Sequence, residues 1–577
     1  MAYQPTVRGT RYMVSAGHYL AAQAAFDILE AGGNAVDAGV AANLALGVLQ
    51  SDMVNIAGVA PILIYRPDAA DRDSRVLTIT GLGPWPKAAR LETFVKEHGG
   101  EIPLGILRTV VPAAPDANIQ ALEKFGTLSF GDVAGAAIRY ARDGFAMHPM
   151  MTAYVKANED KYRMWPENAA IYLPHNRPPQ PGERFVQTDL ARSMQHMVDE
   201  EAAVAKHSRE AGLRAARDAF YTGDIAHAIL KYHRENGGLL AEEDMAGFRS
   251  TIEPPVKMTF RGLGAPLDIY TCGPWCQGPV LLQMMALLEG FDLHAMGHNS
   301  TDYIHVVAES MKLALADRER YYGDPLFVDV PLERLLSDAY NADRRSQIRP
   351  DEAWAEMPPA GDFGNMPGPA WHSATSTESP PMPGDTSYVC VIDRDGMVFS
   401  SNPSDVTWES PVIPGTGLCP SARGSQSFAV PGHASSVAPG KRPRLTPNPA
   451  LAMRDGELMM PIGTPGGDTQ CQAVLQVLLN MELFGMDPQA AVEAPRFITH
   501  SQPDTFSPHT AFPGRLTMEG RIEEKTSDTL AAKGHTVERL DDMTWKTAGV
   551  CLIAQDLKTG VLQGGADPRR PSRAIGW

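Results

Sequence analysis

Residues 381–393 read PMPGDTSYVCVID, and Thr386 lies where a loop rich in proline and glycine meets an alternating run. The residues after Thr386 follow a period of two, with 387, 389 and 391 on one face and 388, 390 and 392 on the other, which predicts a strand. If the peptide bond between Asp385 and Thr386 were cut, the threonine hydroxyl would become a nucleophile that carries its own base, the new α-amino group. Without that cut, Thr386 is simply a β-branched residue of a strand.

The predicted strand has a hairpin partner. An Asp-Gly pair at residues 395–396 separates the alternating run 387–392 from a second run at 397–400. Such a pair between two alternating runs is a strong hairpin signal. We therefore expect Thr386 to open a strand that pairs with its successor, which would hold the threonine side chain rigidly.

The composition is that of a soluble globular protein. The chain has 577 residues, 44% hydrophobic and 21% charged, so it is long enough to bury a large core. Its 68 acidic and 51 basic residues give a formal net charge of -17, which argues against nucleic acid as a partner. We expect no membrane span and no secretory signal, because no window approaches about 18 consecutive apolar residues and no apolar segment follows the basic N-terminus.

Six cysteines are scattered along the chain without the spacing of a disulfide framework. The Cys272-x-x-x-Cys276 pair lacks the second ligand pair of a structural zinc site. We therefore expect reduced thiols, a cytoplasmic location, and neither a metal nor a cofactor.

Helical periodicity dominates the first part of the chain, and strands dominate the last third. Apolar residues recur at helical spacing in residues 19–31, 35–49, 130–142, 279–288 and 301–321. Between the two parts, residues 355–384 are rich in proline, glycine, serine and threonine and have almost no apolar periodicity. We expect a mobile surface segment there.

A glycine-rich turn, PIGTPGGD at residues 461–468, runs directly into an amphipathic helix predicted for residues 469–484. Such a turn gathers unpaired backbone N–H groups and the positive end of the helix dipole at one point. That point suits a developing oxyanion. The alternative interpretation is a tight turn between a strand and a helix, with Asp468 as the N-cap.

A second loop, GKRPRLTPNP at residues 440–449, lies between two predicted strands. Loops of this kind often carry binding groups. Alternatively, its prolines only rigidify a crossing between the strands, and its basic residues are solvated.

The chain resembles the gamma-glutamyltransferase family in eight motifs that stand in the family's order over nearly the whole length. They are GGNAVDA at 32–38, ESMKLALADR at 309–318, GDP at 323–325, GDTS at 384–387 with VID at 391–393, GKRP at 440–443, PGG at 465–467, EAPR at 493–496 and ADPR at 566–569. The resemblance implies an α+β fold, the four-layer αββα sandwich of the N-terminal nucleophile hydrolases.

The resemblance also implies an inactive precursor that cuts itself between Asp385 and Thr386. The cut would leave a large subunit of residues 1–385, with a loose tail at 355–385, and a small subunit of residues 386–577. These two subunits would form one catalytic unit and act on a small-molecule amide. Whether processed pairs dimerise further is left open.

The family's catalytic roles transfer to four positions. Thr386 matches the nucleophile and supplies the α-amine as its base, while Gly466 and Gly467 match the oxyanion hole. Ser404 stands where the family places a second threonine that orients the amine, and serine keeps the hydroxyl.

The family's substrate-binding residues are mostly replaced. Leu82 stands in place of the arginine that binds the α-carboxylate of a glutamyl group, and no carboxylate remains in residues 422–428, where the family has an acidic pair. Val406 replaces an asparagine, and Leu445 and Thr446 replace tandem serines. Charged groups are discriminated by paired, desolvated charges, so we expect that glutathione is not the natural substrate. The pattern is closer to the acylase and amidohydrolase branch.

Four further residues are candidates for substrate contact. Arg423 would return a positive charge to the pocket, with Gln426 beside it, and Trp85 or Trp408 would form an apolar wall. The plain interpretations are a surface arginine and two core tryptophans.

Three other functions stay open at this stage. The first is a true gamma-glutamyltransferase or glutathione hydrolase. The second is a metal-dependent amidohydrolase that uses His305 and Glu309 on one helix face, although the sequence shows no further histidine nearby. The third is a non-catalytic binding protein on the same fold.

Overall fold

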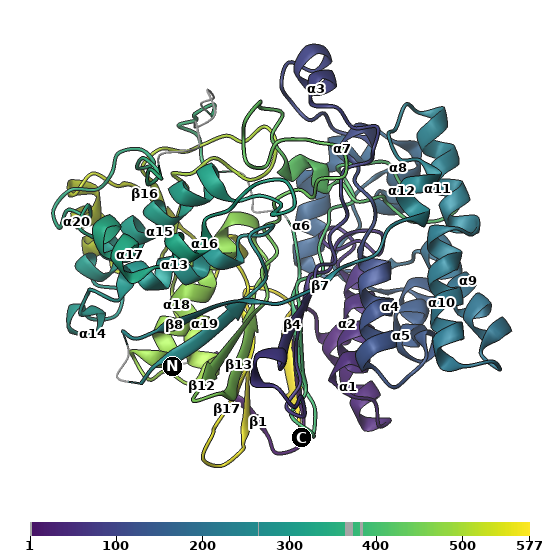
Figure 1. Ribbon diagram of the computed structural model, residues 1–577, viewed down its shortest axis with the longest axis horizontal. Helices are drawn as coiled ribbons and strands as arrows, with labels where there is room; N and C mark the ends of the chain where they lie inside the picture. Colours follow the sequence, from purple (N-terminus) through teal and green to yellow (C-terminus); the bar gives the residue numbers. More distant parts are fainter. Residues whose placement is uncertain (1–2, 263–264, 364–372, 381–384) are drawn as a thin grey trace.

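The computed structural model describes residues 3–262, 265–363, 373–380 and 385–577. Two seven-stranded sheets form its centre (Figure 1). In spatial order, the first contains β1 (Val7–Gly9), β18 (Leu562–Ala566), β17 (Cys551–Gln555), β13 (Glu457–Gly463), β12 (Ala450–Arg454), β9 (Leu267–Thr271) and β8 (Val256–Phe260). The second contains β19 (Arg573–Gly576), β2 (Met13–Ala16), β10 (Val389–Ile392), β11 (Val398–Ser401), β3 (Ile62–Tyr65), β4 (Val76–Ile79) and β7 (Ile252–Glu253).

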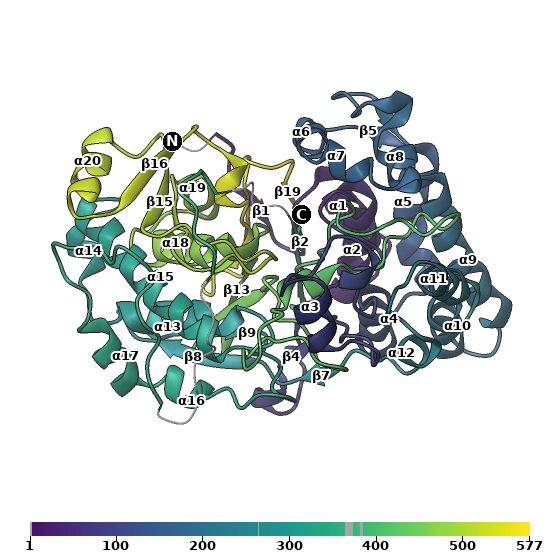
Figure 2. The ribbon, with the colours of Figure 1, turned by 90° about the horizontal axis from the view of Figure 1, so that it is seen from above.

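Helices cover the outer face of each sheet (Figures 1 and 2). The helices α1 (Tyr19–Glu30) and α2 (Ala35–Leu49) pack directly on the second sheet, and α4 (Ala114–Phe125), α5 (Phe130–Asp143), α9 (Thr188–Val204) and α10 (Arg209–Tyr221) pack behind them in the same apolar cluster. The helices α13 (Gly278–Leu288), α18 (Gln470–Glu482) and α19 (Pro488–Glu493) pack directly on the first sheet, and α15 (Thr301–Tyr321) and α20 (Glu524–Ala532) pack behind them. A third apolar cluster lies between the two sheets. The predicted four-layer αββα sandwich is therefore confirmed.

The predicted helices are all present, with ends that differ from the prediction by at most a residue or two. The helix α2 begins at a capping box formed by Asn34 and Asp37 and is buried on all sides. Its alanines and glycines permit this, since a Cβ on Gly39 would collide with the Phe399 ring of β11. The sheet therefore packs closely on this helix.

The predicted hairpin is β10 and β11, which pair antiparallel with Val389 opposite Ser401. Alternate residues of β10 face opposite layers: Val389 and Val391 contact the helices, whereas Cys390 and Ile392 lie between the sheets. The expectation that Thr386 opens this strand is wrong, because β10 begins only at Val389. The Thr386 N–H donates to the Met53 carbonyl instead, at 3.0 Å, and its φ of +78° turns the backbone out of the ladder.

The proline-rich segment is described only in part, and the prediction that it is mobile falls partly on residues that the structure does not describe. Within it, the backbone of Ala374 and Ser376 pairs with Ala511, and Ser379 donates to Glu538 at 2.8 Å. Residues 374–379 therefore lie against the small-subunit part of the chain, near β15 (Arg515–Glu519) and β16 (Thr536–Leu540).

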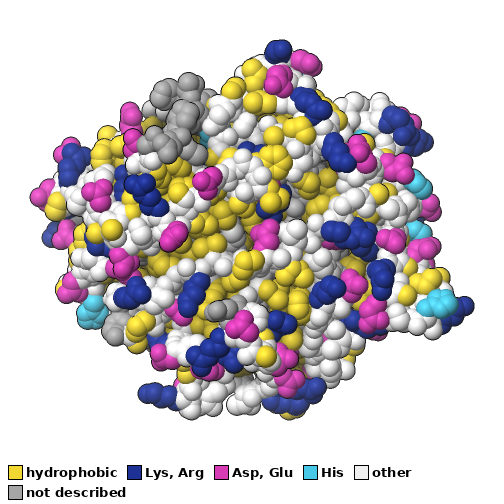
Figure 3. All heavy atoms as spheres, viewed as in Figure 1, with side chains coloured by type: hydrophobic (Ala, Val, Ile, Leu, Met, Phe, Trp, Pro, Cys, Tyr) yellow, Lys and Arg dark blue, Asp and Glu magenta, His cyan; other side chains and the backbone are white. Residues whose placement is uncertain are grey.

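The surface carries charges of both signs. On the face in Figure 3, acidic and basic side chains are interspersed, and apolar side chains show between them in the middle. Among the described helices, none is both long and apolar enough to cross a membrane. The six cysteines, all within the described residues, are free and buried.

Candidate active site

Thr386 is fully buried, and its hydroxyl lies among polar groups from distant parts of the chain. Its Oγ1 is 2.6 Å from the Ser404 hydroxyl, 3.0 Å from Asp385 Oδ1 and 3.4 Å from the amide nitrogen of Gln470. Ser404 follows β11 and forms a backbone bridge with Val59. The hairpin thus brings the two predicted hydroxyls together across its open end.

The predicted oxyanion turn faces the same point. The Gly466 N–H donates to the carbonyl oxygen of Asp385 at 3.3 Å, so the carbonyl of the predicted scissile bond points at the turn before α18. The φ values of Gly466 and Gly467 are +128° and +57°, a region that favours glycine. The side-chain amide of Gln277 donates to the Gly467 carbonyl at 2.9 Å and fixes the turn.

Asp468 does not cap the helix, so that alternative interpretation is wrong. The residue before α18 is Thr469, and its side chain makes no capping hydrogen bond. Asp468 instead forms an ion pair with Arg318 at 2.5 Å and accepts a hydrogen bond from the Thr505 N–H at 2.8 Å. These contacts fix the turn, and its Gly466 N–H is directed at the Asp385 carbonyl.

Arg423 lies in the short helix η4 (Arg423–Gln426) with 1% of its surface exposed, so its interpretation as a surface arginine is wrong. Its guanidinium forms an ion pair with the Asp385 carboxylate and donates to the Ser404 hydroxyl at 2.6 Å. Asp405 lies 3.9 Å from Nε. Burial lowers the pKa of Arg423, but the charges of Asp385 and Asp405 outweigh it and raise the pKa overall. Burial raises the pKa of Asp405 to about 7, although Arg423 opposes the shift.

A cavity of about 770 Å³ opens beside Gly466 and Gly467. Its lining includes Val406 and Trp408, with apolar, acidic and basic side chains and part of the segment 374–380 that precedes the predicted cut. The Lys161 ammonium lies 3.6 Å from the centroid of the Trp408 ring. A cavity of this size holds a small organic molecule.

Trp408 is the candidate for substrate contact that lines this cavity. Within the described part of the chain, Leu82, Trp85, Gln426 and Thr446 are not among the lining residues. Leu82 and Trp85 are each 1% exposed, and Trp85 donates to the Ser427 hydroxyl at 2.9 Å, so Trp85 packs in the interior and does not line this cavity. Gln426 donates to Thr446 Oγ1 at 2.9 Å. These four side chains pack in the protein interior.

Asp52 and Arg570 are two buried ionisable residues that influence each other's pKa, and the sequence analysis missed them. Neither carboxylate oxygen of Asp52 has a hydrogen-bond partner among the described residues. Burial raises the pKa of Asp52 to about 7 despite the positive charge of Arg570 and lowers the pKa of Arg570 to about 10. Arg570 contacts Met53 Sδ at 3.3 Å, and the Met53 carbonyl accepts from Thr386. The signal that the sequence offered for this site was Asp52, an acidic residue in a largely apolar run.

The basic loop at residues 440–449 is buried rather than solvated, so that alternative is wrong. Arg442 pairs with Asp324 at 2.8 Å, and Arg444 pairs with Glu319 at 2.9 Å. Buried arginines with such partners fix the position of a loop. These ion pairs therefore fix the loop, which leads directly into β12.

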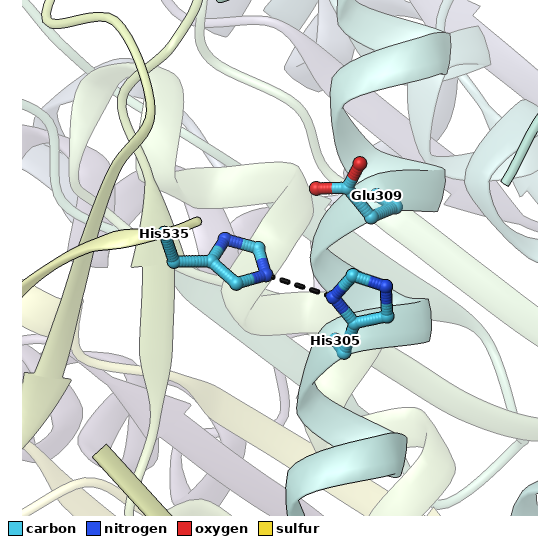
Figure 4. Close-up of side chains that lie close together, drawn as sticks. All are labelled: His305, Glu309 and His535. Atoms are coloured by element: carbon cyan, nitrogen blue, oxygen red, sulfur yellow. Dashed lines mark hydrogen bonds between the residues drawn. The ribbon is translucent and has the colours of Figure 1, made fainter. Parts of the chain in front are cut away.

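His305 and Glu309 project from α15 toward His535, and one ligand atom from each lies within 4.8 Å of the others (Figure 4). The expectation that no further histidine lies near this pair is therefore wrong. His305 Nδ1 is 2.9 Å from His535 Nε2, and its Nε2 is 2.8 Å from the Arg349 carbonyl oxygen. Glu309 forms an ion pair with Lys312 at 2.7 Å. The Lys312 ammonium already neutralises the Glu309 carboxylate. Hydrogen bonds of His305 and this ion pair therefore explain why the three side chains lie together.

Comparison with known proteins gives matches over nearly the whole chain. Residues 21–577 match the family model described as Gamma-glutamyltranspeptidase. The chain is 32% identical over 575 residues to the Glutathione hydrolase-like YwrD proenzyme of Bacillus subtilis, covering 99% of each protein. It is also 32% identical over 546 residues to the Acylase ACY 1 proenzyme of Pseudomonas sp. (strain SE83), covering 92% of this chain and 88% of that protein.

Among solved structures, the cephalosporin acylase from Bacillus halodurans superposes with a TM-score of 0.84 at 27% identity, covering 100% of this chain and 98% of the other. The resemblance drawn from the eight ordered motifs is thereby confirmed, and so is the N-terminal nucleophile hydrolase fold. The chain belongs to the gamma-glutamyltranspeptidase family, whose members are hydrolases and transferases.

Proposed function

We propose that the chain is the precursor of an amide hydrolase that cuts itself before Thr386 and then uses this threonine as its N-terminal nucleophile. The main support is that the Asp385 carbonyl accepts a hydrogen bond from Gly466 N–H while the Thr386 hydroxyl lies 2.6 Å from Ser404. The bond to be broken, its nucleophile and a donor for its oxyanion thus meet at one buried point.

Backbone strain favours the same bond. Thr386 is β-branched and has a φ of +78°, a conformation that costs about 1–3 kcal/mol. The φ torsion spans the peptide bond to Asp385, so it ceases to exist when that bond breaks. Self-cleavage therefore releases the strain.

Self-cleavage proceeds in two steps. The Thr386 oxygen attacks the Asp385 carbonyl carbon, the C–N bond breaks, and the hydroxyl proton passes to the departing nitrogen, which leaves an ester. Water then hydrolyses the ester to free the hydroxyl and the Asp385 α-carboxylate. The new α-amine has an ordinary pKa of about 7.7–8.0, so it can take the hydroxyl proton near neutral pH. The products are the subunits 1–385 and 386–577.

The mature enzyme then hydrolyses an amide through an acyl-enzyme. Thr386 attacks the substrate carbonyl, Gly466 and Gly467 stabilise the oxyanion, the amine leaves with a proton, and water releases the acid. An acylase activity is favoured over a gamma-glutamyl activity, because Leu82 is buried in an apolar cluster where a glutamyl-binding arginine would be needed.

Intact mass measurement of the purified protein under denaturing conditions tests the proposal. We expect two chains, the smaller beginning at Thr386, and hydrolysis of N-acyl anilides by the two-chain form. A single chain that never matures under any condition would refute the proposal, and would favour a binding protein. Faster turnover of gamma-glutamyl anilide than of every acyl anilide would favour a true gamma-glutamyltransferase.

A further inference from the structure

We infer that Arg570 and Asp52 together set the protonation state of the α-amine that self-cleavage frees at Thr386. The Arg570 guanidinium favours the neutral amine, and the Asp52 carboxylate favours the ammonium form. Neither side chain is expected to touch the substrate, because both act through the amine. The inference rests on the proposed function, since the amine exists only after the bond before Thr386 is cut.

Met53 connects the nitrogen of Thr386 to both residues. Its carbonyl accepts the Thr386 N–H at 3.0 Å, so the nitrogen that becomes the amine is directed at this segment. Asp52 directly precedes Met53 in the chain, and Arg570 Nη1 donates to Met53 Sδ at 3.3 Å. A single residue therefore contacts the future amine and the guanidinium and is covalently bonded to the aspartate.

The two charges also act on groups around the bond to be cut. The charges of Asp52 and Asp385 both reach Arg570. Burial raises the pKa of the Tyr154 phenol, and the charges of Asp385 and Asp52 add to this shift. Asp385 is linked to the Thr386 nitrogen by the peptide bond itself. A charge that acts at Asp385 therefore acts on the new amine as well.

Arg570 and Asp52 do not neutralise each other through hydrogen bonds. Among the described residues, Nε and Nη2 of Arg570 and both carboxylate oxygens of Asp52 have no hydrogen-bond partner. Arg570 is 4% exposed and Asp52 is fully buried, so solvent and salt screen their charges little. Such charges change the pKa of neighbouring groups.

Both residues are charged in the pH range in which an α-amine titrates, at about 7.7–8.0. Burial lowers the pKa of Arg570 only to about 10, so the guanidinium is positive throughout this range. Burial raises the pKa of Asp52 to about 7, so most of the carboxylate is ionised there. Their opposite effects on the amine are therefore present together near pH 8.

Other ionisable groups around the two residues are paired or neutral near pH 8. They are the pairs Arg423 with Asp405 and Arg496 with Asp567, the His148 imidazole, whose pKa burial lowers to about 4, and the Tyr154 phenol, whose pKa burial raises. None of them is changed in the experiment below. Their influence on the amine is therefore constant across the variants.

The reactivity of Thr386 reports the protonation state of the amine. Phenylmethylsulfonyl fluoride forms a sulfonate ester with a nucleophilic hydroxyl: the oxygen–sulfur bond forms, fluoride leaves, and the amine takes the hydroxyl proton. The rate therefore falls as the amine becomes protonated. The mass of the small subunit measures the labelling rate at each pH, and the profile gives an apparent pKa without knowledge of the natural substrate.

Asp52→Asn removes the anion and keeps the shape of the side chain. On matured enzyme, the apparent pKa should fall by about half a pH unit or more, because the ammonium form loses a favourable charge. The profile should therefore move to lower pH. An unchanged apparent pKa, or a rise, overturns the inference.

Arg570→Met is tested in the Asp52→Asn background, so that its loss leaves no unpaired carboxylate at position 52. The apparent pKa should rise by about half a pH unit or more above that of Asp52→Asn alone. Arg570→Lys in the same background keeps the charge and should keep the lower value. The control is Arg573→Gln, an exposed arginine of β19, which should leave the wild-type profile unchanged.

A structural role would slow labelling in both variants without moving the two profiles in opposite directions. Equal apparent pKa values for the methionine and lysine variants would contradict the inference. If the methionine variant fails to mature, the Asp52→Asn shift still decides the question. Two-chain wild-type enzyme that neither reacts with the sulfonyl fluoride nor hydrolyses any acyl anilide refutes the proposed function itself, whereas normal reactivity with unshifted profiles refutes only this inference.

Discussion

The turn at Gly466 and the short helix at Arg423 both contact Asp385, but one contact is made by the backbone and the other by a side chain. Gly466 uses its backbone N–H, whereas Arg423 uses a side-chain charge. A backbone contact depends on conformation and needs only a glycine, so it persists when neighbouring side chains change. A side-chain contact changes with a single substitution. On the proposed function, the catalytic side of the site is therefore the less easily changed of the two, and the substrate side can change with a single substitution.

The largest effect should come from removing the nucleophile. Thr386→Ala should abolish both maturation and amide hydrolysis, because no other hydroxyl is bonded to the nascent amine. Thr386→Ser, which keeps the hydroxyl, should mature and retain activity. Electrophoresis and anilide turnover measure both variants. Residual hydrolysis by the alanine variant would place the chemistry elsewhere.

Disturbing the backbone donor should have the next largest effect. Gly466→Ala forces a side chain into a φ of +128° and against the Thr469 hydroxyl, which should slow maturation and hydrolysis on the order of 10²–10³-fold. Gly485→Ala is a matched control, since its φ is +62° but nothing lies within 4 Å of the added Cβ. Comparable losses of activity in both variants would show that the effect is only one of folding.

Asp385→Asn separates the two contacts. It keeps the backbone carbonyl bonded to Gly466 but removes the charge that pairs with Arg423, so maturation should slow on the order of tenfold or more. Once matured, the variant should have wild-type kinetics, because Asp385 is no longer in the site. Time courses of cleavage followed by steady-state assays measure this. Altered kinetics of the matured variant would mean that Asp385 stays beside Thr386.

A smaller effect concerns Asp52 and pH. Its pKa is about 3.9 in an unfolded chain, and burial raises it to about 7 in the folded protein. The folded state therefore binds more protons between these values, and the contribution of Asp52 to stability falls as pH rises from about 4 to about 7. Relative to wild type, Asp52→Asn should gain about 1–4 °C in melting temperature between pH 5 and pH 8. Asp224→Asn, whose side chain is 88% exposed, should show no such trend.

The smallest effect expected is that of metal removal. Chelators should leave amide hydrolysis unchanged, because Thr386 chemistry needs no metal and Lys312 already pairs with Glu309. Turnover is measured before and after dialysis against a chelator. A loss that zinc restores would revive the metal-dependent alternative through His305 and His535.

The sequence by itself determined the helices, the hairpin and the candidate nucleophile, and its eight motifs identified the family and, through that resemblance, the four layers. Helical and alternating periodicities depend only on which neighbours along the chain share a face, so both can be recognised without knowledge of the fold. The same holds for the glycine turn before α18, because its conformation is local. The expectation that Thr386 begins the strand failed because Met53, far away in the chain, takes its N–H.

Only the tertiary structure decided how the side chains around the site are used. Arg423 and Trp85 each fitted two interpretations in the sequence, since burial and ion pairing depend on residues hundreds of positions away. Packing made Trp85 part of the interior and set Arg423 against Asp385. It also buried Asp52 within the electrostatic influence of Arg570 and brought His535 to His305. Charges and hydrogen bonds act through space, so their partners become known only when the chain is folded.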